Sequence, residues 1–274
     1  MTDQTRIIAV ANQKGGVGKT TTVINLAACI AEKNYRVLVV DLDPQANATS
    51  GLGLTTGVSG SDLFESLIGE MPLSDSIITS SFSGIDIIPS DPDLAASEIH
   101  IARMDSYLTC FKQSVEPLVA SHTYDFIIID CPPSLGILTM NALTAADSIL
   151  IPIQCEYYAL EGLSVIIKFI RELQESGANP DLTVEGILMT MYDGRTNLSA
   201  QVVLEVRGYF GDQVYQTVIP RNVRLGEAPS HGCPAVHYDK NATGSCAYRQ
   251  FTEEFLEQCT RPVPTPVIET TIPS

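Results

Sequence analysis

The stretch Lys14-Gly15-Gly16-Val17-Gly18-Lys19-Thr20-Thr21 decides the fold of this chain. It follows an apolar run over residues 7–11 and opens an amphipathic run over residues 23–32. Strand, glycine-rich loop and helix in this order are typical of a phosphate-binding loop. Glycines let successive backbone N–H groups turn toward a phosphate, and the helix that follows directs its positive end at the same point. We therefore expect residues 15–21 to form a nucleotide site.

The two lysines of this loop have different explanations. Lys19 is placed to contact the β- and γ-phosphates of ATP, and the next hydroxyl, on Thr20, is placed to ligate Mg²⁺. Lys14 precedes the first glycine and is not needed for that cradle. From the residues alone, Lys14 is either an exposed loop lysine or a residue that reaches the nucleotide of a second subunit. In the second case it would stabilise transition-state charge in trans, as an arginine finger does.

Two further apolar runs end in aspartate. Asp41 and Asp43 end the run that begins near residue 36, and Asp130 ends the run Ile127 to Ile129. Strand ends of an open α/β sheet face the ligand crevice. A carboxylate at position 43 can hold Mg²⁺ waters or orient the attacking water. A plain Asp-Pro turn is the alternative there. Asp130 has the pattern of a Walker B residue near Mg²⁺, and residues 131–136 are predicted to form a switch loop sensitive to the γ-phosphate.

Apolar runs rich in Ile and Val alternate with helical patterns along the chain. Most of these runs are continuous, which is typical of parallel strands covered on both faces. The alternation predicts an α/β fold with a doubly wound, mostly parallel sheet flanked by helices. Strands are expected at 7–12, 36–41, 85–89, 126–130, 148–152, 184–189 and 214–219, and helices at 20–33, 94–120, 135–145, 161–176, 199–210 and 245–258.

No repeat or linker divides the chain, so residues 1–260 are predicted to form a single domain. Residues 51–84 are rich in Gly, Ser and Thr and are expected to be a surface insertion with a short helix near 63–68. Residues 261–274 carry four prolines, which predicts a disordered tail. The alternative is a Pro-rich segment that a partner protein binds. Neither a membrane-length apolar run nor a signal-peptide pattern is found, so a cytoplasmic protein is expected.

Charge and cysteine content limit the function classes. The 274 residues include 16 basic and 32 acidic side chains, a formal net charge of −16. Such a chain repels nucleic acid at long range, so DNA binding would need a local basic patch. None of the seven cysteines has CxxC spacing, which favours reduced thiols in the core over a zinc site or an iron–sulfur cluster.

These elements together resemble the ParA/MinD family of P-loop ATPases, which carry a deviant Walker A motif. KGGVGKTT at 14–21, DLDPQANAT at 41–49 and IIIDCPPSLG at 127–136 match its three nucleotide motifs in order and spacing. VIPRNVRLGEAPSHG at 218–232 and YDGRTN at 192–197 resemble the signature of its chromosomal ParA (Soj) branch. The resemblance covers about residues 6–258.

The resemblance implies an ATP-bound homodimer in which Lys14 crosses to the nucleotide of the partner subunit. It implies that Asp43 positions the attacking water and that Pro220 and Asn222 border the adenine. ATP and Mg²⁺ would be the cofactors, with slow basal hydrolysis to ADP and phosphate. A ParB-type partner would stimulate that hydrolysis, in the service of chromosome or plasmid partitioning.

The resemblance also implies non-specific DNA binding by the dimer, and hence association with the nucleoid. Arg195 and Arg224 fall on family positions linked to DNA binding; structural ion pairs or nucleotide contacts are their alternatives. One departure weakens this implication. The family often carries more basic residues after the element that corresponds to His231-Gly232. Here Lys240 is the only basic residue within 238–244.

Three alternatives stay open. A ParA-like positioning protein or nucleotide-dependent scaffold for another cargo would suit the acidity of the chain. A MinD-like membrane switch would need a basic amphipathic helix at its end, but the tail holds only Arg261, so no stable membrane association is expected. Amide-forming or reductase-type relatives would need a second substrate site or a cluster, and the residues after Pro220 argue against them.

Overall fold

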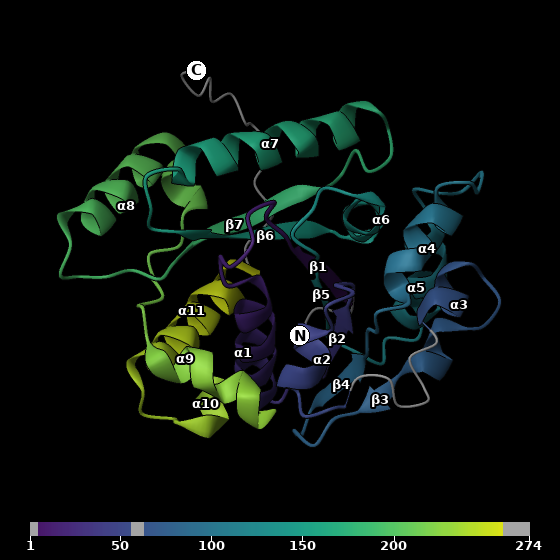
Figure 1. Cartoon of the computed structure of the whole chain (residues 1–274), viewed down its shortest axis with the longest axis horizontal. Coiled ribbons are helices and arrows are strands. Elements are labelled where there is room, and N and C mark those ends of the chain that lie inside the picture. The colour runs from purple at the N-terminus through teal and green to yellow at the C-terminus, as the bar shows by residue number, and fades with distance from the viewer. Residues whose placement is uncertain (1–4, 56–62, 260–274) are drawn as a thin grey trace.

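The apolar runs form a seven-stranded sheet within residues 5–55 and 63–259, the part of the chain that the computed structural model describes (Figure 1). The strand order is β3-β4-β2-β5-β1-β6-β7, and every neighbouring pair is parallel except β3 with β4. The predicted doubly wound, mostly parallel fold is confirmed. The strands are β1 (Arg6–Val10), β2 (Val37–Asp41), β3 (Ile78–Thr79), β4 (Ile85–Ile88), β5 (Phe126–Asp130), β6 (Ser148–Gln154) and β7 (Thr183–Thr190).

Helices cover both faces of this sheet, as Figure 1 shows. The described ranges also contain three short 3₁₀ segments, Leu73–Ser76, Gly211–Gln213 and Ala228–His231. The α-helices are α1 (Lys19–Glu32), α2 (Asn47–Gly51), α3 (Leu63–Leu67), α4 (Leu94–Ile101), α5 (Cys110–Ala120), α6 (Ile137–Ala145), α7 (Ala159–Glu175), α8 (Asn197–Phe210), α9 (Val223–Glu227), α10 (Ala235–Tyr238) and α11 (Thr243–Cys259).

Two hydrophobic cores result from the alternation of side chains along each strand. On β1, Ile8 and Val10 enter the core shared with α1 and α11, whereas Ile7 and Ala9 enter the core shared with α6 and α7. Both sets are buried, which explains why the strands are continuously apolar in sequence. The two cores pack against opposite faces of the sheet, and this packing fixes the positions of the strand ends.

The nucleotide-type crevice follows from this topology. The adjacent strands β1 and β5 send their helices, α1 and α6, to opposite faces of the sheet. Such a switch point leaves a crevice outside the carboxyl ends of the strands. The register places Asp130 beside Val10 on one side and beside Asp41 on the other. The loop after β1 and the predicted carboxylates therefore meet at one edge.

The predicted helix over 94–120 is wrong, because α4 ends at Ile101 and α5 begins at Cys110. Between them the chain turns at Ser106, whose carbonyl accepts hydrogen bonds from the Thr109 hydroxyl at 3.3 Å and the Cys110 thiol at 3.2 Å. Short polar side chains that bond locally to the backbone compete with helix formation. The apolar periodicity continues across this turn, which is why the pattern suggested one helix.

The predicted strand over 214–219 is also wrong, since this segment forms only one isolated bridge with β7, between Val214 and Ile187. Tyr215 and Ile219 donate backbone hydrogen bonds to the β7 carbonyls of Ile187 and Met189, and side chains bind the backbone groups between these two points. The Glu254 carboxylate accepts from the N–H of Gln216 at 2.6 Å and of Thr217 at 2.9 Å. Arg207 Nη2 donates to the carbonyls of Tyr215 and Gln216. An apolar run alone does not reveal such side-chain partners.

Residues 51–84 are not a surface insertion where the structure describes them. Leu63, Leu67 and Leu73 are buried in the core, and β3 adds an antiparallel edge to β4. The predicted short helix near 63–68 is present as α3. The predicted tail, residues 261–274, lies outside the described residues.

All seven cysteines are free thiols, as predicted, and four of them are buried. Within the described ranges, no helix is both long and apolar enough to span a lipid bilayer.

Candidate functional site

The loop after β1 depends on glycine at two positions. Gly16 has φ 74° and Gly18 has φ 91°, in the left-handed region that glycine adopts without a Cβ penalty. Gly18 directly precedes α1, so the loop delivers the chain into the positive end of this helix. A Cβ added at Gly15 would lie 3.9 Å from the Pro133 Cβ. The glycine loop and the predicted switch loop, residues 131–136, are therefore in close contact.

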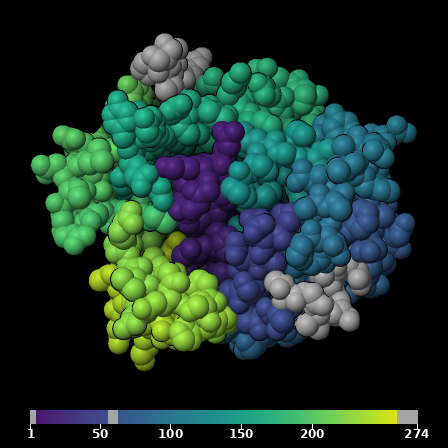
Figure 2. All heavy atoms as spheres, in the orientation of Figure 1, coloured from purple at the N-terminus to yellow at the C-terminus, as the bar shows by residue number. Residues whose placement is uncertain are grey.

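Lys19 brings a desolvated positive charge to this loop. The residue is only 7% exposed, and its Nζ donates to the Lys14 carbonyl oxygen at 3.3 Å. Burial lowers the pKa of Lys19, whereas the charges of Asp130, Cys131 and Asp43 raise it. In Figure 2 the N-terminal part of the chain, in purple, reaches the surface near the centre of the view. The loop thus offers an anion a partly buried cation together with a helix N-terminus.

Asp130 is a buried carboxylate whose two oxygens have no hydrogen-bond partner among the described residues. Burial raises the pKa of Asp130 well above its usual range, and the neighbouring Asp41 raises it further. The nearby Thr20 hydroxyl and the Lys19 ammonium lower it. A buried charge without a partner is costly unless a cation or donor satisfies it. The Asp130 oxygens together with the Thr20 hydroxyl fit the oxygen-ligand chemistry of Mg²⁺ with its waters.

Asp41 and Asp43 make different contacts although they lie only two residues apart, Asp41 as the last residue of β2 and Asp43 just beyond it. The Asp41 carboxylate accepts hydrogen bonds from the Thr49 N–H at 2.8 Å, the Thr49 hydroxyl at 2.7 Å and the Asp43 N–H at 3.2 Å. Burial raises the pKa of Asp41 to about 6. Asp41 therefore holds α2 and the turn in place.

Asp43 continues this turn and faces the site. Its Oδ1 accepts from the Gln45 N–H at 3.0 Å, and its carbonyl accepts from the Ala46 N–H at 2.8 Å. The Asp43 charge acts on both Lys19 and Asp130. The Asp-Pro turn considered as an alternative exists, and its Asp43 carboxylate lies near enough to Lys19 and Asp130 for its charge to act on both.

Lys14 forms an ion pair with Glu156, the second residue after β6. The distance from Lys14 Nζ to Glu156 Oε2 is 2.8 Å, and both side chains are 46% exposed. The Lys14 N–H donates to Asn12 Oδ1 at 3.0 Å. In the single chain, Lys14 is thus engaged outside the phosphate cradle. Its predicted role across a dimer stays a prediction.

Three residues that the sequence analysis missed hold the loop in place. Gln154 Nε2 donates to the Gly16 carbonyl at 2.9 Å, and the Thr190 hydroxyl donates to the Val17 carbonyl at 2.8 Å. Asn12 Nδ2 donates to the Pro152 carbonyl at 2.8 Å. Gln154 and Thr190 are the last residues of β6 and β7. A polar residue that ends an apolar run was the signal that identified Asp130, and it would have identified these two as well.

The stretches with the predicted DNA-contacting arginines lie side by side. The Tyr192 N–H donates to the Ile219 carbonyl at 3.0 Å, and the Arg221 N–H donates to the Tyr192 carbonyl at 2.9 Å. Residues 192–197 and 218–224 are therefore joined into one surface, although they are distant in sequence. This surface follows β7, at the carboxyl edge of the sheet.

Both predicted arginines are ion-paired in the structure. Arg195 forms a bidentate ion pair with Asp193, from Nε to Oδ1 at 2.8 Å and from Nη2 to Oδ2 at 2.7 Å. These hydrogen bonds hold the pKa of Asp193 well below its usual range. Arg224 Nη1 lies 2.6 Å from Glu227, and Arg224 Nε lies 3.4 Å from Asp239. The structural ion pairs considered as an alternative are present, while the guanidinium groups stay partly or largely exposed.

Pro220 and Asn222 lie on the same surface. The backbone of Pro220 forms an isolated bridge with Tyr192. Asn222 caps α9, since its Oδ1 accepts from the Arg224 N–H at 2.9 Å, and its Nδ2 donates to the Thr243 hydroxyl at 2.7 Å. The amide of Asn222 is thus used for local structure, and the predicted adenine contact of both residues stays a prediction.

Comparison with known proteins identifies the family. A family model described as an AAA domain matches residues 5–184. The chromosome partitioning protein ParA of Myxococcus xanthus is 49% identical over 255 residues, which is 93% of this chain and 89% of that protein. The sporulation initiation inhibitor protein Soj of Bacillus subtilis is 51% identical over 249 residues, 91% of this chain and 97% of that protein.

The chain belongs to the ParA/Soj family of P-loop ATPases. A solved structure of similar fold is the cobyrinic acid a,c-diamide synthase of Mycobacterium smegmatis with a bound ATP analog and magnesium. It is 36% identical, has a TM-score of 0.81, and the match covers 96% of this chain and 100% of that one. The resemblance drawn from the motifs is confirmed.

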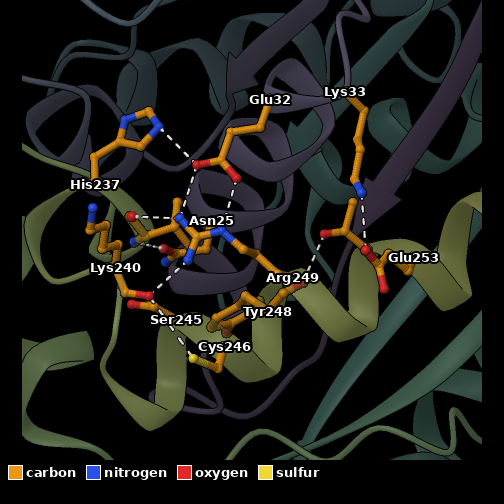
Figure 3. Close-up of polar contacts among 12 residues, drawn as sticks. Asn25, Glu32, Lys33, His237, Lys240, Ser245, Cys246, Tyr248, Arg249 and Glu253 are labelled. Carbon is orange, nitrogen blue, oxygen red and sulfur yellow. Dashed lines mark hydrogen bonds and ion pairs between the residues drawn. The ribbon is translucent and has the colours of Figure 1, made fainter.

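In this ParA/Soj-family chain, the helix that begins at the loop is tied to the C-terminal helices (Figure 3). Glu32, at the end of α1, receives hydrogen bonds from Arg249 at 2.9 and 3.0 Å. Arg249 also donates to the Val236 carbonyl at 2.9 Å, and the Val236 N–H donates to Asn25 Oδ1 at 3.2 Å. These bonds join α1 to α10 and α11, so the loop helix and residues 235–249 form one packed unit.

Proposed function

We propose that this chain is a ParA-type ATPase that ATP switches from a monomer to a homodimer, and that serves chromosome or plasmid partitioning. The observation that carries the proposal is the pair of lysines in the glycine loop. Lys19 is folded into the phosphate cradle, while Lys14 lies outside it, on an exposed ion pair. A second lysine that its own cradle does not use is what a nucleotide shared between two subunits requires.

ATP and Mg²⁺ fit the loop. The related diamide synthase structure holds an ATP analog and magnesium, and the orphaned oxygens of Asp130 fit a hydrated cation. Thr20 and Asp130 would hold Mg²⁺, which neutralises phosphate charge when bound. Lys19 and the N–H groups of the loop bind the phosphates. Asp43, whose carboxylate lies beside Lys19 and Asp130, orients the attacking water.

Dimerisation completes this site. Lys14 leaves Glu156 and places its ammonium group on the nucleotide of the partner subunit, where it stabilises the charge that develops during hydrolysis. The exposed Lys14–Glu156 pair opposes this movement only weakly, because surface ion pairs contribute about 0.2–1 kcal/mol. Hydrolysis is slow in the isolated protein and is stimulated by a ParB-type partner.

The ATP-bound dimer binds DNA without sequence preference through the surface that carries Arg195 and Arg224. This DNA-binding role is supported by the backbone hydrogen bonds that join residues 192–197 to residues 218–224 in one surface. Against it stand the net charge of −16 and the carboxylates paired with both arginines. DNA phosphates must therefore displace Asp193, Glu227 and Asp239. We expect the binding to be weak and to fall steeply with salt.

The same ion pairs favour one alternative, a ParA-like protein that positions another cargo and does not use DNA. An amide-forming synthase, as one structural relative is named, is less well supported. That relative is 36% identical, whereas the partitioning relatives are 49% and 51% identical.

DNA binding measured with ATP, with ADP and without nucleotide, over a series of salt concentrations, separates these functions. We expect binding only with ATP, and Arg224→Ala should reduce the salt slope by about one. The matched control is Lys168→Ala, an exposed cation on α7 that should leave the slope unchanged. Absence of ATP-dependent binding even at low salt would contradict the DNA role and favour the cargo-positioning alternative.

A further inference from the structure

Two carbonyl groups of the glycine loop receive hydrogen bonds from the ends of two other strands. Gln154, at the end of β6, donates to the Gly16 carbonyl at 2.9 Å. Thr190, at the end of β7, donates to the Val17 carbonyl at 2.8 Å. Both partners are more than 130 residues away in sequence. The contacts therefore exist only because the fold brings these strand ends to the loop.

We propose that Gln154 and Thr190 are positioning residues, which orient the loop for phosphate before any nucleotide arrives. A peptide unit is planar and trans, so its C=O and N–H groups point in opposite directions. Fixing the Gly16 carbonyl therefore fixes the N–H of Val17, and fixing the Val17 carbonyl fixes the N–H of Gly18. With their carbonyls held from outside, these N–H groups face the cradle.

Burial makes the Thr190 contact the stronger of the two. Thr190 is 2% exposed, and its hydroxyl also lies 3.0 Å from the Ile153 carbonyl, so one hydrogen is shared between two buried acceptors. Its methyl group lies 3.8 Å from the place where a Cβ on Gly18 would be. In a site shielded from water, the loss of this donor leaves the Val17 carbonyl free to turn. The left-handed glycines on either side supply no resistance, because they rotate easily.

Gln154 holds the loop at a less buried point. Its Nε2 also lies 2.9 Å from the sulfur of Met191, the residue after β7. Met191 has φ 52°, an uncommon value for a side chain of this size. The ends of β6 and β7 are thus linked to each other as well as to the loop. Neither residue reaches the nucleotide in this account, so both act through the backbone of residues 16–18.

Nucleotide affinity separates this positioning role from plain packing. This inference rests on the proposed ATP binding, so the affinity of wild-type protein for Mg²⁺–ATP is measured first by calorimetry. Thr190→Val keeps the shape of the side chain and removes the donor, and it should weaken ATP binding about tenfold. Thr190→Ser restores the donor and should bind within about twofold of wild type. The matched control is Thr183→Val, at the other end of β7, whose hydroxyl donates to the Asp147 carbonyl.

Gln154→Ala tests the second contact at a position where misfolding is less of a concern, with the exposed Gln201→Ala on α8 as its control. We expect a three- to tenfold loss for Gln154→Ala and none for the control. Thermal unfolding without nucleotide checks that Thr190→Val and Thr183→Val are both folded. Wild-type affinity in both Thr190→Val and Gln154→Ala would overturn the inference, and so would failure of Thr190→Ser to restore binding. Failure of the wild type to bind ATP would overturn the proposed function and this inference together.

Discussion

At the residue scale, Asp41 and Asp130 show that the same side chain at neighbouring strand ends can serve structure or chemistry. Both are buried and lie opposite each other in the sheet. The Asp41 carboxylate accepts three hydrogen bonds, which hold Thr49 and the turn at Asp43. The Asp130 oxygens accept none among the described residues. Burial raises the pKa of both carboxyl groups, but only Asp41 has hydrogen bonds that offset the cost of its buried charge.

Asp130→Asn should stabilise the protein in the presence of a chelator and without nucleotide, by about 1–3 kcal/mol, because burial and Asp41 disfavour the Asp130 charge more than Thr20 and Lys19 favour it. The pKa of Asp130 is raised, so its ionisation costs folding free energy as the pH rises above the ordinary carboxyl range. The gain from Asp130→Asn should thus be larger at pH 8 than at pH 5. Urea unfolding at both pH values measures this difference. A loss of stability at pH 8 would contradict this account of Asp130.

Asp41→Asn is the matched comparison, and it should have the opposite sign. An amide has only one acceptor oxygen, so the substitution leaves at least one of the Thr49 or Asp43 donors unpaired. We expect a loss of about 1–3 kcal/mol at pH 5, measured by the same urea unfolding. This pH is chosen because burial raises the pKa of Asp41 to about 6, so that ionisation of Asp41 offsets part of the loss at higher pH. Equal behaviour of the two variants would show that the hydrogen bonds do not distinguish these carboxylates.

Glu156→Gln should make Lys14 more available, because it removes the charge that pairs with the Lys14 ammonium. ATP-driven dimerisation should strengthen by about two- to fivefold, in line with the small contribution of an exposed ion pair. The dimer dissociation constant measured by sedimentation tests this. Glu172→Gln on α7, which removes a similar exposed ion pair with Lys168, is the control. Weaker dimerisation of Glu156→Gln than of this control would show that Glu156 has a favourable role in the dimer.

At the element scale, the strands and the site they build were predictable to different degrees. Apolar runs predicted β1, β2, β4, β5, β6 and β7. Polar residues at run ends made Asp43 and Asp130 candidates for the site. The strand predicted at residues 214–219 is absent because the side chains of Glu254 and Arg207 bind the backbone groups between its two backbone contacts with β7. Gln154 and Thr190 carry the same run-end signal, but their contacts with the loop could not be predicted, because these depend on the order of β1, β6 and β7 in the sheet.

The surface made by residues 192–197 and 218–224 carries a prediction at this scale. Glu227→Gln combined with Asp239→Asn frees Arg224 from both carboxylates. ATP-dependent DNA binding should become about two- to tenfold tighter at low salt, since each exposed ion pair contributes only about 0.2–1 kcal/mol. Fluorescence anisotropy with a labelled duplex measures it. The control, Glu172→Gln with Glu175→Gln on α7, changes the net charge by the same amount. An equal increase in DNA affinity in this control would show that net charge, and not the release of Arg224, causes the effect.

At the scale of the whole molecule, one sheet between two cores holds every part of the proposed switch at a single edge. The glycine loop, Asp43, Asp130 and the surface with Arg195 and Arg224 all follow carboxyl ends of its parallel strands. The bonds of Glu32 and Asn25 extend this arrangement to α10 and α11. The acidity of the chain, with 32 carboxylates against 16 basic residues, opposes only the DNA-binding step. Nucleotide-driven dimerisation is therefore the central claim.

Sedimentation velocity of the Asp43→Ala variant, which should bind ATP without hydrolysing it, tests this claim most directly. With Mg²⁺–ATP we predict a species of twice the chain mass, and with ADP a single chain. Adding Lys14→Ala to this variant should leave it a single chain with ATP, whereas the control Lys33→Ala, at an exposed lysine on the other end of α1, should still dimerise. A dimer that forms equally well with ADP, or with ATP in the absence of Lys14, would contradict the account.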